Sequence, residues 1–216
     1  MKILYLIMFI SVTIIHLYAT YSNNRPFRNV TKGLIVLTLL GFYQSSVDEV
    51  SWAIVLALLL SWIGDMLLIP RGLKWFVSGG IAFMASHFFL VLGFLETFSM
   101  KDVPLVFVFG VIALYLIASA FVFFNLRKHV KTFFVFPLLF YLLVNATMNC
   151  FAWYRMIAYG FHYNTIISVV GAICFFLSDA ALFFVNFNKQ TRMKSHFLVM
   201  LTYSLGEFLI ILGLII

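Results

Sequence analysis

Long apolar runs separated by short polar connections make up the whole chain. Each run has about 20 residues, enough for a helix to cross the hydrocarbon core of a bilayer. The runs are continuous and do not alternate apolar with polar positions, which favours helices over barrel strands. We expect eight spans, at residues 3–21, 31–47, 50–69, 75–98, 103–125, 133–154, 163–187 and 196–216. The pattern therefore predicts an all-α polytopic membrane protein, with residues 1–216 forming one eight-helix domain.

Composition agrees with a membrane protein, because 64% of the 216 residues are hydrophobic and only 10% are charged. A soluble domain of this size has no way to bury so much apolar surface. We expect a multi-pass integral protein whose surroundings are the lipid bilayer, in a bacterial inner membrane rather than in the endoplasmic reticulum.

Basic residues gather on one side of the predicted bundle. Eleven of the fourteen Lys and Arg residues flank the first, third, fifth and seventh connections: Arg25, Arg28, Lys32, Arg71, Lys74, Arg127, Lys128, Lys131, Lys189, Arg192 and Lys194. The positive-inside rule makes this side cytoplasmic, so both termini are expected outside the cytoplasm. The net charge of +7 therefore indicates topology and lipid-headgroup contact, not nucleic-acid binding.

Four of the ionisable residues inside the predicted spans share a local pattern, in which a small residue comes directly before them. The pairs are Gly64-Asp65, Ser86-His87, Ser178-Asp179 and Gly206-Glu207. Small residues let helix backbones approach closely, and an ionisable group in lipid needs a partner there. We expect these four side chains to border one cavity in the cytoplasmic half of the bundle. Lys32 lies near the same surface, and Asn145 is a further candidate for the cavity wall.

These residues also have a purely structural interpretation. Each of these residues, taken alone, is as well explained by a structural hydrogen bond, and a single salt bridge such as Lys32–Asp179 accounts for two of them. The stretches "GDMLL" and "SDAAL" are weakly similar to each other. This similarity suggests the alternative that the chain is an internal duplication of two four-helix halves in parallel orientation.

The order of the motifs resembles the YhhN-like membrane family, which includes the lysoplasmalogenases. The matching stretches are "GDMLLIPRGLKWFVSGGIAFMASHF", "GAICFFLSDAAL" and "YSLGEFLI", and the span pattern covers the whole chain. Two positions depart from the family pattern: Gly33 follows Lys32 where the family commonly has Pro, and Leu90 stands where a Tyr is often found.

The resemblance implies hydrolysis of the vinyl ether bond of a lysoplasmalogen to a fatty aldehyde and a glycerophospho-base. That chemistry needs an acid to protonate carbon and a carboxylate to stabilise the cation and activate water. We expect Asp65 and Asp179 to form this pair, with the acid undecided between them. His87 and Glu207 would position water or tune the pair, Lys32 would meet the phosphate, and Ser178, Tyr203 and Asn145 complete the expected substrate contacts.

Two other classes of function stay open at this point. The same polar cluster suits a proton-coupled transporter of a small amphiphile, and Asp65, His87, Asp179 and Glu207 suit a single divalent ion. No His-x-x-x-His or Glu-x-x-His spacing supports a metal, so we expect neither metal nor cofactor. The expected partner is a lysophospholipid substrate, and headgroup preference and oligomeric state stay open.

Overall fold

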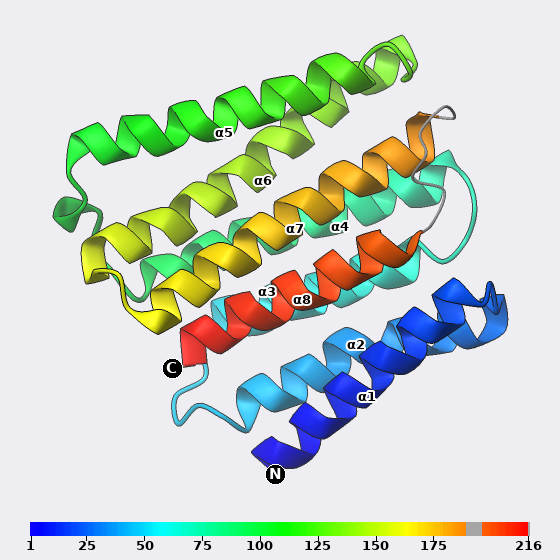
Figure 1. Cartoon of the computed structure of the whole chain (residues 1–216), viewed down its shortest axis with the longest axis horizontal. Helices are drawn as coiled ribbons and strands as arrows, with labels where there is room; N and C mark the ends of the chain where they lie inside the picture. The colour runs from blue at the N-terminus through cyan, green and yellow to red at the C-terminus, as the bar shows by residue number, and fades with distance from the viewer. Residues whose placement is uncertain (189–195, 216) are drawn as a thin grey trace. The chain divides into compact units, whose positions relative to one another are not determined.

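The computed structural model describes residues 1–188 and 196–215, and in this part of the chain every regular element is helical. Lys189, Arg192 and Lys194, which contribute to the predicted charge asymmetry, lie outside the described residues. Eight α-helices and one short 3-10 helix follow one another (Figure 1): α1 Lys2–Tyr21, α2 Arg25–Gln44, α3 Trp52–Leu67, α4 Leu73–Leu95, η1 Met100–Asp102, α5 Leu105–Leu126, α6 Thr132–Tyr159, α7 Tyr163–Phe187 and α8 His196–Ile215. The all-helical class is confirmed.

Two helix ends differ from the predicted boundaries by five residues or more, each for a local reason. Helix α2 begins at Arg25 instead of residue 31, because the Asn24 side chain caps it by accepting from the Phe27 amide and Pro26 fits its first turn. Helix α6 continues to Tyr159 instead of residue 154, and it stops where Gly160 adopts a φ of 93°.

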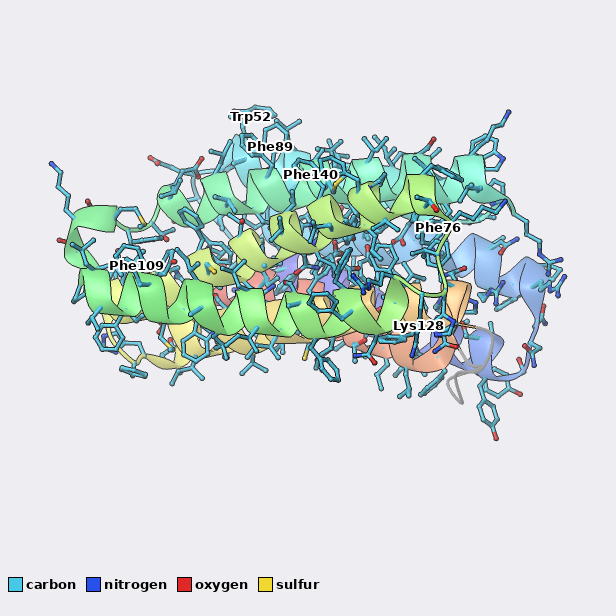
Figure 2. The ribbon with its side chains drawn as sticks, turned by 90° about the horizontal axis from the view of Figure 1, so that it is seen from above. Trp52, Phe76, Phe89, Phe109, Lys128 and Phe140 are labelled. Atoms are coloured by element: carbon cyan, nitrogen blue, oxygen red, sulfur yellow. The ribbon has the colours of Figure 1, made fainter. Side chains whose placement is uncertain are left out.

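Six of the described helices are long and apolar enough to cross a membrane: α1, α4, α5, α6, α7 and α8. Helix α3 is apolar but has 16 residues, and α2 includes the basic residues of the first connection. Bulky apolar side chains project from the ribbon in Figure 2, where Phe109 of α5 and Phe140 of α6 are 67% and 53% exposed. Such a surface suits lipid contact, and the protein is a multi-pass membrane protein. The count of eight spans stays a prediction, as does the side of the termini.

The chain divides into two compact units, Met1–Gly93 and Phe94–Leu214. The first unit contains α1, α2, α3 and nearly all of α4. The second contains the last residues of α4, then η1, α5, α6, α7 and α8. Four helices therefore dominate each unit.

In the first unit, consecutive helices pack side by side, α1 on α2 and α2 on α3 (Figure 1). Small residues bring α3 against α4: a Cβ built on Gly64 would lie 2.7 Å from the Phe83 ring, and one on Gly79 would lie 3.2 Å from the Gly64 carbonyl oxygen. Glycine at these points therefore allows α3 and α4 to approach closely.

In the second unit, α5 packs on α6 and α6 packs on α7. Helices α7 and α8 approach backbone to backbone, since a Cβ on Gly171 would lie 2.7 Å from the Ile210 nitrogen and a Cβ on Gly206 would lie 2.8 Å from the Phe175 nitrogen. Gly206, the small residue that precedes Glu207, thus lies in a packing face.

Candidate functional site

Asp65 and Lys32 form a buried ion pair between α3 and α2. The Lys32 Nζ lies 3.3 Å from Asp65 Oδ1, and the two side chains are 14% and 2% exposed, in the order Lys32 and Asp65. Two contacts hold the helices together at this level: the Trp62 indole N–H donates to the Gly33 carbonyl at 2.9 Å, and Gly33 lies against the Met66 thioether. The ion pair and these contacts therefore fix α2 against α3 at the level of Asp65.

A second set of polar contacts joins α3 to α4. The hydroxyls of Ser61 and Ser86 are 2.8 Å apart, and both side chains are buried. The Nδ1 of His87 hydrogen-bonds the carbonyl oxygen of Phe83. A carbonyl only accepts, so Nδ1 is the donor in this bond. The bond holds the His87 ring against the backbone of its own helix.

Asp179 lies at the centre of a polar network between α7 and α6. Its Oδ2 accepts hydrogen bonds from the Tyr141 hydroxyl, at 2.7 Å, and from the Asn145 side-chain amide. Asn149 in turn donates to Asn145 Oδ1 at 2.9 Å, which turns the NH₂ group of Asn145 toward the carboxyl group. All four side chains are buried. Two donors converge on one oxygen, which is an arrangement that suits a carboxylate.

Helix α8 contributes the last predicted residues. The Ser178 hydroxyl donates to the Val199 carbonyl of α8 at 2.9 Å, so it ties α7 to α8. The Tyr203 ring packs edge-to-face on Phe175 with centroids 5.4 Å apart. Glu207 is buried and follows directly on the close contact at Gly206. These side chains are thus held in place by the packing of α7 and α8.

The predicted residues fall into two groups, one in each unit. Lys32, Asp65 and His87 lie in the first unit, and the second holds Asn145, Ser178, Asp179, Tyr203 and Glu207. The structure joins Lys32 to Asp65 and Asn145 to Asp179. In both units the aspartate is on the third helix and binds side chains of the second, which is the arrangement that a parallel repeat would give. The duplication itself, and the shared pocket of Asp65 and Asp179, stay predictions.

Tyr141 is a site residue that the sequence analysis missed. It precedes Asn145 by four residues and Asn149 by eight, so the three share one face of α6. That spacing was a usable signal, but Tyr is common throughout this chain and carries no charge to mark it. Its role depends on the position of Asp179 on another helix, which the local sequence does not contain.

Within each unit, the described residues include no group of three or more His, Cys, Asp or Glu side chains arranged to hold a metal ion. The residues named for a divalent ion in the sequence are divided between the units, with Asp65 and His87 in one and Asp179 and Glu207 in the other.

In a comparison with known protein families, the model of the YhhN family matches residues 27–214. The chain belongs to the YhhN family. The matched range contains every candidate residue of this YhhN protein, from Lys32 to Glu207, and begins after α1. Searches of curated proteins and of solved structures found no match to the chain.

Proposed function

We propose that this YhhN protein is a lysoplasmalogenase-type hydrolase that cleaves the vinyl ether bond of an alkenyl lysophospholipid by carboxylate chemistry. The observation that carries the proposal is the pair of buried aspartates, each held by donors of a neighbouring helix within its own unit. Placing an ionisable group inside the membrane costs free energy, so its presence there points to function. Family membership supports the same reaction class.

Different surroundings suggest different roles for the two carboxyl groups. Asp179 accepts two hydrogen bonds from short, packed side chains, so it suits the carboxylate that stabilises the cation and takes a proton from water. Asp65 depends on Lys32, a long side chain near the end of the apolar region. A substrate phosphate would compete for that lysine. With that lysine engaged by phosphate, the Asp65 carboxyl group would bind a proton more readily and serve as the acid.

In the proposed reaction, Asp65 gives its proton to the β-carbon of the vinyl ether, and an oxocarbenium ion forms. Water adds to the adjacent carbon while Asp179 takes one of its protons, which gives a hemiacetal. Asp65 then accepts the hemiacetal hydroxyl proton and Asp179 protonates the departing glycerol oxygen, so aldehyde and alcohol leave and both acids regain their starting states. The scheme requires both groups to reach one substrate.

The test is incubation of the purified protein with an alkenyl lysophospholipid and, separately, with its acyl counterpart. We expect fatty aldehyde from the first and no fatty acid from the second. Fatty acid from the acyl lipid would make the protein an ordinary lysophospholipase. With no product from either lipid, and proton-coupled uptake of a lysolipid into proteoliposomes, the transporter alternative would replace the hydrolase.

Replacing Tyr141 by Phe is expected to lower aldehyde release about ten- to a hundredfold, because a buried hydrogen bond to a charged group contributes about 1.5–3 kcal/mol. The measurement is kcat for the alkenyl substrate. Tyr154→Phe is the matched control, since Tyr154 lies on the same helix, is also buried, and donates to the Val108 carbonyl. Equal activity of the two variants would remove Tyr141 from the site.

A further inference from the structure

Arg155 is a buried cation near one end of the second unit, outside the proposed reaction. It is 5% exposed and precedes the last residue of α6 by four positions. Its Nε donates to the Thr97 hydroxyl at 3.1 Å, and its Nη1 donates to the Ser168 hydroxyl at 3.0 Å. The guanidinium is therefore fixed in place by two neutral groups.

Three segments of the second unit build this position. Thr97 lies just beyond the end of α4, and the next residue, Phe98, contacts the Phe151 ring of α6 at 6.5 Å between centroids. Ser168 comes from α7, which returns antiparallel to α6 after a tight turn closed by the Thr165 hydroxyl on the Gly160 carbonyl. The site is thus formed by a connection and a helical hairpin.

No negative charge balances Arg155 in the described part of the unit. The hydroxyl protons of Thr97 and Ser168 go to the carbonyls of Phe94 and Asn164, so both groups are neutral and already satisfied. No carboxylate of the described residues forms an ion pair with the guanidinium. Arg155 also lies outside the last turn of α6, where a helix dipole would best stabilise a cation. A buried charge without a counter-ion is costly, and a ligand anion would remove that cost.

The guanidinium has donors left for such an anion. Of its five N–H groups, two are used by Thr97 and Ser168, and both of those on Nη2 and one on Nη1 remain. Adjacent donors of this kind make two-pronged hydrogen bonds to phosphate. Arg155 lies about 6 Å from the end of α6, at the depth expected for headgroup phosphates. We propose that Arg155, with Thr97 and Ser168, forms a binding site for a phosphate group, either of a phospholipid headgroup or of a free phosphate ion.

This phosphate site is separate from the Asp179 network. Arg155 follows Asn145 by ten residues on the same helix, a distance of about 15 Å along the axis. Only a glycerol unit separates the phosphate of a lysoplasmalogen from its ether oxygen, so one molecule bound at Asp179 does not also reach Arg155. The Arg155 site therefore takes a second ligand, and its occupancy is measurable whether or not the protein hydrolyses lipid.

The test is a ligand titration of the purified, delipidated full chain in an uncharged detergent. The unfolding temperature of the protein is measured at each ligand concentration. Three probes are compared: a short-chain phosphatidylglycerol, the diacylglycerol of the same chains, and inorganic phosphate. We expect a saturable rise in unfolding temperature with phosphatidylglycerol and no rise with diacylglycerol. A matching rise with inorganic phosphate would assign the site to phosphate in general, and its absence would assign the site to lipid headgroups. No rise with either phosphate probe overturns the proposal.

Variants separate a binding role from a purely structural one. Arg155→Gln is expected to lose the phosphate-dependent rise, whatever its own unfolding temperature. Where that variant does not fold, Arg155→Lys is used instead. Lysine keeps the charge but lacks the paired N–H donors of the guanidinium, so this variant is expected to bind the phosphate probe at least about tenfold more weakly. Lys101→Gln, an exposed basic residue of the same connection, should bind like the wild type. Unchanged binding by the Arg155 variants, or equal loss in Lys101→Gln, contradicts the proposal.

Discussion

Replacing Asp179 or Asp65 by asparagine is expected to reduce aldehyde release from an alkenyl lysophospholipid at least about a hundredfold, and up to about ten thousandfold. An amide has nearly the shape of the carboxyl group but does not exchange a proton with carbon or water. In Asp179→Asn, the carbonyl oxygen of the new amide would still accept from Tyr141, so this variant should fold. The measurement is aldehyde formation by purified variants of verified unfolding temperature.

The two variants are expected to differ in stability, and this difference supplies a control. Asp65→Asn leaves Lys32 without its partner in a mostly buried position, which costs up to about 3–5 kcal/mol for a fully buried pair. The double variant Asp65→Asn/Lys32→Met removes both charges, so its unfolding temperature should recover while its activity stays lost. Asp102→Asn, in the exposed η1 turn, should leave both properties unchanged. Recovery of activity in the double variant would show that Asp65 has only a structural role.

The sequence was sufficient to predict the helices and their packing faces. Eight apolar runs correspond to the eight described α-helices, because hydrophobic length is a local property. Gly64 and Asp65, which the sequence pairs within one span, are both buried on α3, as a small residue beside an ionisable one indicates. The start of α2 and the end of α6 differ from the expected residues, because the Asn24 cap and the positive φ of Gly160 outweigh hydrophobicity in setting where a helix begins or ends.

The partners of the buried charges were beyond sequence reasoning. A Lys32–Asp179 pair was one alternative from the sequence, whereas the structure pairs Lys32 with Asp65 on the next helix. Which side chain meets a carboxylate depends on the rotation and register of two packed helices, and hydrophobic periodicity fixes neither to within one residue. Tyr141 and Arg155 were overlooked for the same reason, since the role of each depends on groups of other segments.

Replacing Gly171 or Gly206 by Ala is expected to lower the stability of the second unit by about 1–3 kcal/mol each. The added Cβ at Gly171 would lie 2.7 Å from the Ile210 nitrogen and 2.8 Å from the Gly206 carbonyl oxygen. These are backbone atoms, so no side-chain rotation relieves the clash and α7 must move away from α8. Close packing is a principal source of helix association in lipid, where hydrophobic burial contributes little.

Gly110→Ala on α5 is the matched control, because a Cβ there meets nothing within 4 Å. That change should be neutral or stabilising by up to about 1 kcal/mol, since Ala is the better helix former. The measurement is thermal unfolding of the purified variants in the same detergent. Separation of α7 from α8 would also break the bond from Ser178 to the Val199 carbonyl, so Ser178→Ala should cost less in a Gly171→Ala background than in the wild type. Full additivity of the two changes, or a Gly171→Ala protein as stable as Gly110→Ala, would mean that this backbone contact does not hold α7 against α8.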